Sequence, residues 1–231
     1  MRFVFLGPPG TGKGSLAWLC ERRVGLVHVS TGEIFRQEIA RRTPLGRRVQ
    51  QYVTNGRLVP NALVVNVMVS RLTPKILAKG FVLDGFPRTK GQAAGLDQAL
   101  AQRKAPLQAA IHLDSPERLL IRRLTGRRVC SRCGANFHIR TMRPKRPGRC
   151  DYCQGRLIIR KDDQVDTIKK RLAIDRKASA PLVAYYRQRG LLYSVNGAGH
   201  VETVFVRMMK LFRQHGWLKQ CHDRAQNRRR N

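Results

Sequence analysis

Residues 3–15 have the sequence FVFLGPPGTGKGS, in which four apolar residues lead into a glycine-rich turn that carries a lysine. Glycines at this spacing let backbone N–H groups turn inward around phosphate oxygens, and the partial positive charge of the following helix start adds to the attraction. The usual pattern places serine or threonine directly after the lysine, whereas here Gly14 intervenes before Ser15. The stretch predicts a strand, a phosphate-binding loop and a helix, with Lys13 reaching the outer phosphates.

Short apolar runs alternate with longer amphipathic stretches along most of the chain. The apolar runs predict strands at residues 3–6, 81–83, 109–113 and 191–195. The amphipathic stretches predict helices at residues 13–23, 62–72, 89–102, 116–125 and 166–188. Ser115 is the predicted N-cap of the fourth helix, with Pro116 as its first residue. Such alternation is typical of helices wrapped around a parallel sheet, so the predicted fold class is α/β, with a P-loop NTPase-type parallel sheet flanked by helices.

Two segments interrupt this alternation. Residues 30–59, which we call the helical insertion, predict short helices that open on a capping box of Ser30 and Glu33. Residues 127–161, which we call the cysteine segment, have little apolar periodicity and are rich in glycine, proline and arginine. The rest of the chain is predicted to form a discontinuous core, made of residues 1–29, 60–126 and 162–215. A basic C-terminal tail is predicted at residues 216–231.

Four of the six cysteines form two CxxC pairs, with sixteen residues between the pairs. In a cytosolic chain this spacing predicts a structural zinc site on Cys130, Cys133, Cys150 and Cys153. Four thiolates leave no open position for catalysis. The metal would instead staple a segment that lacks its own core, contributing about 10–16 kcal/mol of apparent free energy. Disulfide or redox chemistry is the alternative.

The composition is strongly basic, with 46 Lys and Arg residues against 14 Asp and Glu residues and a net charge of +32. This balance favours polyanionic partners such as nucleotides, RNA or an anionic membrane surface. The competing interpretation is a solvated surface that has drifted toward arginine, because the charge is spread along the whole chain. Weak nucleic-acid association through the basic surface and tail is a further hypothesis.

Hydrophobicity gives no sign of a membrane or secretory segment. No run approaches the roughly 18 apolar residues of a membrane span. The apolar run at the N-terminus stops at Gly7 and is too short for a secretory signal. We therefore expect a cytoplasmic protein without membrane association.

Further motifs follow the phosphate loop in a fixed order. They are STGE at 30–33, Arg36, GRLV at 56–59, DGFPR at 84–88, Gln92, GRRV at 126–129, RKDD at 160–163 and Arg171. In this order and spacing, residues 1 to about 215 resemble adenylate kinases of the long-lid bacterial type, whose lid carries a zinc site. The resemblance implies a monomer that reversibly transfers the terminal phosphoryl group of Mg-ATP to AMP, giving two ADP. It also implies that the helical insertion binds AMP and that the cysteine segment is a zinc-stapled lid.

The resemblance also implies site residues, and the chemistry is consistent with them. Two polyanionic nucleotides must be brought end to end, so catalysis is mainly positioning and electrostatic stabilisation. The residues implied around the transferring group are Lys13, Asp84, Arg88, Arg123, Arg127, Arg160 and Arg171, with Asp84 holding Mg²⁺ through its waters. The implied ATP site comprises Gly10, Thr11, Gly12, Lys13, Gly14, Ser15, Arg127, Asn136, Phe137 and Gly199. The implied AMP site comprises Thr31, Arg36, Arg57, Leu58, Val59, Gly85, Phe86, Pro87, Arg88, Gln92, Arg160 and Arg171, with Thr31 and Gln92 at the adenine.

The sequence departs from the family at a few positions. Asn61 and Ala62 stand where the family usually has Asp-Glu, Asn196 replaces a common aspartate, and Phe137 replaces a frequent tyrosine. None of these changes removes a phosphate-handling group. Two alternatives stay open, namely a kinase for another nucleoside monophosphate and an RNA-associated nucleotide-binding protein on the same fold.

Overall fold

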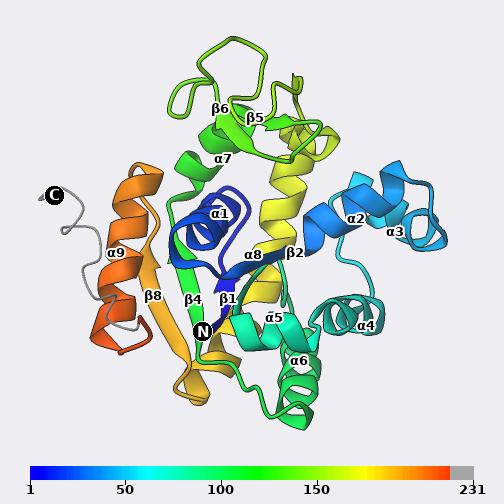
Figure 1. Cartoon of the computed structure of the whole chain (residues 1–231). Helices are drawn as coiled ribbons and strands as arrows, with labels where there is room; N and C mark the ends of the chain where they lie inside the picture. The colour runs from blue at the N-terminus through cyan, green and yellow to red at the C-terminus, as the bar shows by residue number, and fades with distance from the viewer. Residues whose placement is uncertain (219–231) are drawn as a thin grey trace, which may run out of the picture.

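A five-stranded parallel sheet forms the centre of the computed structural model, which describes residues 1–218 (Figure 1). Its strands are β1 (Arg2–Leu6), β2 (Val27–Ser30), β3 (Phe81–Asp84), β4 (Ala109–Asp114) and β8 (Leu192–Asn196). They are hydrogen-bonded in the order β2-β3-β1-β4-β8, and every neighbouring pair is parallel. The carboxyl ends of all five strands therefore lie at one edge of the sheet, where α/β proteins bind ligands.

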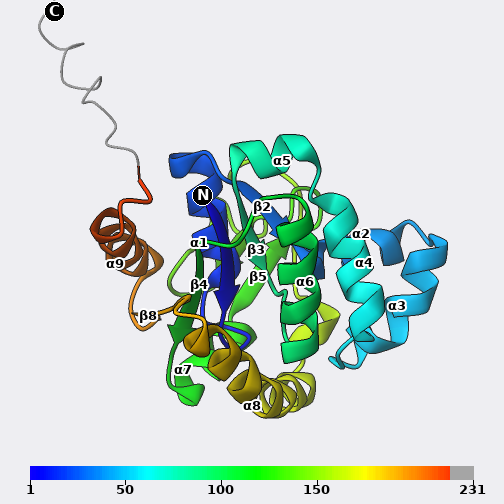
Figure 2. The ribbon, with the colours of Figure 1, turned by 90° about the horizontal axis from the view of Figure 1, so that it is seen from below.

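Helices cover both faces of this sheet (Figure 2). The α-helices within residues 1–218 are α1 (Lys13–Val24), α2 (Thr31–Ala40), α3 (Pro44–Thr54), α4 (Asn61–Arg71), α5 (Pro74–Lys79), α6 (Lys90–Gln102), α7 (Glu117–Thr125), α8 (Val165–Gln188) and α9 (Val201–Gln214). Helices α1 and α9 pack on one face, and α4, α6 and α8 contribute to the cluster on the other. The predicted α/β fold class is confirmed.

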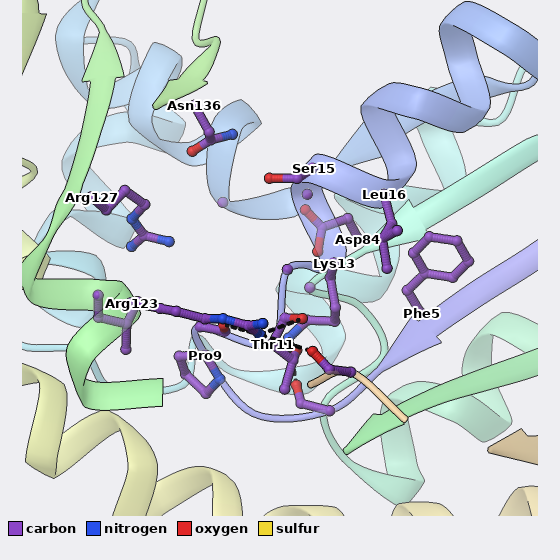
Figure 3. Close-up of a pocket in the computed structure, with 18 of the residues that line it drawn as sticks. Phe5, Pro9, Thr11, Lys13, Ser15, Leu16, Asp84, Arg123, Arg127 and Asn136 are labelled. Atoms are coloured by element: carbon purple, nitrogen blue, oxygen red, sulfur yellow. Dashed lines mark hydrogen bonds between the residues drawn. The ribbon is translucent and has the colours of Figure 1, made fainter. Parts of the chain in front are cut away.

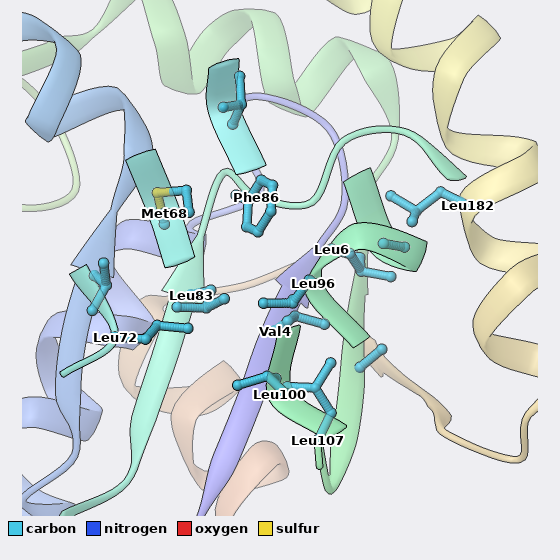
Figure 4. Close-up of a cluster of buried hydrophobic side chains, with 14 of the residues drawn as sticks. Val4, Leu6, Met68, Leu72, Leu83, Phe86, Leu96, Leu100, Leu107 and Leu182 are labelled. Atoms are coloured by element: carbon cyan, nitrogen blue, oxygen red, sulfur yellow. The ribbon is translucent and has the colours of Figure 1, made fainter. Parts of the chain in front are cut away.

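The central strand explains why both faces need helices. Successive side chains of a strand point to opposite faces. Accordingly, Phe3 and Phe5 of β1 pack with Phe212 of α9, whereas Val4 and Leu6 pack in the opposite cluster (Figure 4). All four of these side chains are at most 3% exposed, so the continuous apolar run of β1 reflects burial on both sides.

The four predicted strands and five predicted helices are all present, with ends that shift by one residue in most cases. One predicted cap is wrong: α7 begins at Glu117 with Pro116 as its N-cap, because Pro116 has φ −56° and ψ 139°, outside the helical region. The buried Ser115 hydroxyl has no hydrogen-bond partner among the described residues. Strand β2 and helices α5 and α9 were not predicted, and β2 has only four residues, which end directly in α2.

The helical insertion contains α2 and α3. Ser30 caps α2 and accepts a hydrogen bond from the backbone N–H of Glu33 at 3.4 Å, which supports the serine half of the predicted capping box. Thr43 caps α3 in the same way. Buried apolar residues from this insertion join the main cluster of the sheet, so it shares the hydrophobic core.

The cysteine segment forms a separate three-stranded antiparallel sheet. Its strands are β5 (Arg127–Cys130), β6 (Asn136–His138) and β7 (Leu157–Ile158), in the order β6-β5-β7. A short 3₁₀ turn (Lys161–Asp163) leads from it into α8. Only four buried residues make up its cluster, and two of them are cysteines.

Helix α8 is the longest helix in the described part of the chain, with 24 residues and a length of about 36 Å. Ile168 and Leu172 in its first half pack in a small cluster with residues of α7. Tyr185 and Tyr186 in its second half belong to the main cluster. Pro181 lies inside the helix, between these two contact regions.

Within residues 1–218, no helix combines the length and apolarity needed to cross a membrane. Most of the predicted tail, residues 219–231, lies outside the described residues.

Candidate active site

A cavity of about 430 Å³ lies where the phosphate loop follows β1 (Figure 3). All seven residues implied around the transferring group line it, and so do all ten residues of the implied ATP site. Figure 3 shows Arg123 and Arg127 reaching into it from the side opposite Lys13 and Asp84. The volume falls within the range of about 300–1,000 Å³ that is usual for small-molecule sites.

The phosphate loop has the geometry that its glycines predict. Gly10 and Gly12 have positive φ angles of 90° and 96°, which other residues rarely adopt. Helix α1 has no side-chain cap, so the free N–H groups of its first turn lie at the cavity wall and favour an anion. The Lys13 ammonium donates to the carbonyl oxygens of Gly7 and Pro8. Burial lowers the pKa of Lys13 to about 8, against the opposing attraction of carboxylates in the cavity.

Asp84 ends β3 directly beside β1, in register with Phe5. His28 of β2 lies next to it, with Nε2 3.5 Å from Asp84 Oδ2. Burial alone would raise the pKa of Asp84, but the attraction of His28 and Lys13 outweighs it and lowers the pKa to about 2. A Cβ on Gly14 would lie 3.1 Å from Asp84 Oδ2. The glycine that follows Lys13 therefore leaves room for an ionised carboxylate, an oxygen ligand that suits Mg²⁺.

Positive charge dominates the cavity, which is lined by eight Lys or Arg residues and three carboxylates. Asp163 accepts two hydrogen bonds from Arg127, at 2.8 and 2.5 Å, and Asp162 pairs with Arg171 at 2.9 Å. Arg160 forms no such ion pair within the described residues: its Nη2 donates to Asn136 Oδ1 at 3.4 Å, and its buried Nε makes no hydrogen bond. Burial, reinforced by neighbouring arginines, lowers its pKa to about 9, so the guanidinium stays charged at neutral pH. Buried charge of this kind needs an anion to compensate it.

A smaller pocket of about 80 Å³ lies against the helical insertion. It is lined by nine of the twelve residues of the implied AMP site: Thr31, Arg36, Arg57, Leu58, Val59, Gly85, Arg88, Gln92 and Arg171. Pro87 and Arg160 line the large cavity instead, and the Phe86 side chain packs in the core (Figure 4). Arg36, Arg88 and Arg171 line both spaces. The two spaces are therefore adjacent and share their arginines.

The four cysteines of the two CxxC pairs come together in the cysteine segment, with all four sulfur atoms within 4.8 Å of one another. The sulfurs of Cys130 and Cys153 are 3.4 Å apart, and those of Cys133 and Cys150 are 3.5 Å apart. Tetrahedral ligands with Zn–S bonds of about 2.3 Å would be about 3.8 Å apart. A Cβ on Gly155 would lie 2.8 Å from the sulfur of Cys130, so this glycine allows the thiols to converge. The arrangement suits one tetrahedral metal ion.

Several residues that line the large cavity were not predicted. They are His28, Glu33, Arg122, His138, Asp175 and His200. His28 is one that sequence reasoning could have found, since it alternates with Val27 and Val29 immediately before the STGE motif. Glu33, Arg122, His138 and His200 lie next to or between predicted site residues, and Asp175 lies one helical turn after Arg171.

The phosphate loop at the end of β1, in a parallel sheet flanked by helices, defines a P-loop NTPase-like protein with a strongly basic cavity. The family model for adenylate kinase matches residues 5–191. Curated proteins named adenylate kinase align with most of the chain, at 46% identity over 206 residues in Moorella thermoacetica and 42% over 205 residues in Clostridium tetani. Each alignment covers 89% of this chain and 95% of the relative.

The chain belongs to the adenylate kinase family, as the resemblance of its motifs predicted, and it is a phosphotransferase. The roles of individual residues stay predictions.

Proposed function

We propose that this protein transfers the terminal phosphoryl group of Mg-ATP to AMP, reversibly, giving two ADP. The observation that carries the proposal is the sharing of Arg36, Arg88 and Arg171 between the large cavity and the small pocket. A phosphoryl group that passes between nucleotides held in these two spaces would stay surrounded by the same guanidinium groups. Positioning and charge stabilisation of this kind supply most of the catalysis in phosphoryl transfer.

In this proposal the phosphate loop and Lys13 bind the outer phosphates of ATP, while Arg123 and Arg127 bind from the opposite side. Arg36 and Arg88 bind the phosphate of AMP, and Thr31 and Gln92 contact its adenine. Asp84 would hold Mg²⁺ through water molecules, and the bound cation would neutralise part of the charge on the polyphosphate. Arg160 and Arg171 would stabilise the charge that spreads over the transferring group, an effect worth roughly 10³- to 10⁵-fold for a single arginine.

The cysteine segment would act as a zinc-stapled lid over the ATP site. Its Gly134 lies against Glu33 of α2, and its Thr141 carbonyl lies 3.2 Å from His200 Nε2. These contacts support a lid that spans the cavity. Closure would exclude water, which competes with AMP as a phosphoryl acceptor. Loosening the lid should therefore speed ATP hydrolysis in the absence of AMP, and unchanged hydrolysis would count against this role.

The small pocket is narrower than a nucleotide site usually is. Its volume of about 80 Å³ is well below the range of about 300–1,000 Å³ that small-molecule sites usually have. Admission of a nucleotide would therefore need the pocket to widen, and residues of α2 and α3 form part of its wall.

One assay tests the reaction and its nearest competitor. ADP formation from ATP should be followed with AMP, CMP, UMP and GMP as acceptors, and AMP should give by far the highest kcat/KM. A preference for another monophosphate would replace AMP in the proposal. No diphosphate with any acceptor, from metal-loaded protein that binds both nucleotides, would overturn it.

The RNA-associated alternative has a test of its own. Its support is the charge of +32, the two CxxC pairs and the basic tail. Against it, the cysteine segment has few aromatic rings for base stacking: Phe137 is buried, and Tyr152 is exposed. RNA binding that weakens with salt and survives Lys13→Met would favour it.

A further inference from the structure

Asn61, which stands where the family usually has aspartate, lies at the centre of a hydrogen-bond network beside the small pocket. It is the first residue of α4. Its Oδ1 accepts a hydrogen bond from the Thr89 hydroxyl at 3.0 Å and another from Gln92 Nε2 at 3.1 Å. Gln92 lines the pocket and is only 2% exposed. The network therefore joins the start of α4 to a buried amide in the acceptor site.

Main-chain chemistry fixes which way the Gln92 amide faces. The backbone N–H of Arg88 donates to Gln92 Oε1 at 2.7 Å. Because an N–H group can only donate, the atom facing it must be the amide oxygen. The amide nitrogen must then face Asn61, which in turn must present its oxygen. Thr89 holds Asn61 in that orientation, since its hydroxyl accepts from the backbone N–H of Gln92 and has its own hydrogen free to donate.

Each end of the Gln92 amide retains one unused hydrogen-bonding position. A primary amide has two N–H hydrogens and two oxygen lone pairs, and the network uses one of each. One N–H of Nε2 and one lone pair of Oε1 stay available. Their positions could be exchanged only by turning the amide over, which would break both fixed hydrogen bonds.

We propose that Asn61 is a positioning residue for base selection: it locks Gln92 so that the pocket accepts 6-aminopurines and rejects 6-oxopurines. Adenine presents a donor at its exocyclic N6 and an acceptor at N1, which match the oxygen and the N–H of the locked amide. Hypoxanthine and guanine present an acceptor at O6 and a donor at N1, which would require the amide to reverse. The proposal deepens the proposed function, on which it rests, by assigning the choice of acceptor base to a residue outside the pocket lining.

The test compares AMP with IMP, because these nucleotides differ only at position 6 and in the proton on N1. In Asn61→Ala, reversal of the Gln92 amide would break only the hydrogen bond from the Arg88 backbone N–H, instead of two hydrogen bonds. The ratio of kcat/KM for AMP over IMP should then fall about three- to tenfold, as expected for one hydrogen bond. Asn61→Asp keeps both accepted hydrogen bonds and should retain the ratio. Asn66→Ala is the matched control, since Asn66 is an exposed residue of the same helix.

The outcomes separate the inference from the proposed function. An unchanged ratio in Asn61→Ala, or an equal fall in Asn61→Asp, would overturn the inference. No ADP from AMP with the unaltered protein would instead overturn the proposed function. If Asn61→Ala does not fold, the unaltered protein provides a second test by NMR. AMP should shift only one Gln92 side-chain amide proton strongly, because the other is donated to Asn61, and equal shifts of both would contradict the proposal.

Discussion

The helical insertion and the cysteine segment border the same cavity but are held by different forces. Phe35, Val49 and Val59 of the insertion are buried in the main apolar cluster. The cluster of the cysteine segment has only four buried residues, and its four thiols converge instead. The contrast teaches that one insertion is stabilised by burial of apolar surface, whereas the other lacks such burial and brings together four thiols in an arrangement that suits a metal ion.

Removal of the metal should have the largest effect on activity, and it should affect the cysteine segment but not the helical insertion. Structural zinc contributes about 10–16 kcal/mol of apparent free energy, so a chelator or Cys150→Ser should unfold the cysteine segment and abolish phosphoryl transfer. Hydrogen exchange should show lost protection at residues 127–161 and retained protection at residues 30–59. Cys20→Ala, which removes a thiol outside the cysteine segment, should change neither phosphoryl transfer nor the hydrogen-exchange protection of either region. If the cysteine segment stayed protected from exchange without metal, the view that it depends on the metal for its stability would be contradicted.

Arg160→Ala should have the next largest effect, because it removes a guanidinium of the cavity that forms no ion pair within the described residues and whose fully buried Nε makes no hydrogen bond there. We expect kcat to fall by at least about 10³-fold, with the fold intact. Arg156→Ala removes an exposed arginine four residues earlier and should leave kcat unchanged. Equal kcat values for the two variants, measured by coupled ADP formation, would exclude a role for Arg160 in the reaction.

Val49→Ala tests the other side of the comparison. Val49 is 0% exposed and lines neither pocket, so the substitution should lower the free energy of unfolding by about 1.5–3 kcal/mol. Urea denaturation of the metal-loaded protein measures this loss. Val206→Ala, at a position that is 64% exposed, should cost far less. Similar losses for both variants would contradict the view that apolar burial anchors the insertion.

Tyr152→Ala should have the smallest effect, since it weakens a single contact between the cysteine segment and α1. The Tyr152 ring lies 5.1 Å from the ring of Trp18, and the guanidinium of Arg22 lies over both rings. Such a contact is worth about 0.5–1.5 kcal/mol, so the KM for ATP should rise about two- to tenfold. Tyr152→Phe keeps the ring and should behave like the unaltered protein. Trp18 fluorescence reports whether the contact is lost.

Local sequence predicted the parts of this molecule that local chemistry determines. The phosphate loop could be predicted from the residues between β1 and α1 alone. The four candidate metal-ligand cysteines could be predicted from the spacing of the two CxxC pairs. The glycine after Lys13 was visible as a departure from the usual pattern, but its reason was not. That reason is the distance to Asp84, which is 70 positions further along the chain and is set by the pairing of β1 with β3.

Contacts between distant segments explain most of what was missed. His28 lies beside Asp84 because β2 pairs with β3, and β2 itself is too short to show a clear pattern. Asn61 was visible as an unusual residue, yet its hydrogen bond to Gln92 spans 31 positions and depends on how α4 meets α6. Sequence spacing shows which residues are unusual, whereas the fold shows what they contact.

The proline inside α8 gives this helix two mechanically distinct halves. A proline has no N–H to donate, so the helix lacks one hydrogen bond of its regular ladder at Pro181. The half that carries Arg171 packs with α7, and the half beyond Pro181 is fixed to the central sheet. A bend at Pro181 would therefore move Arg171 together with α7 and leave the half that packs on the central sheet in place.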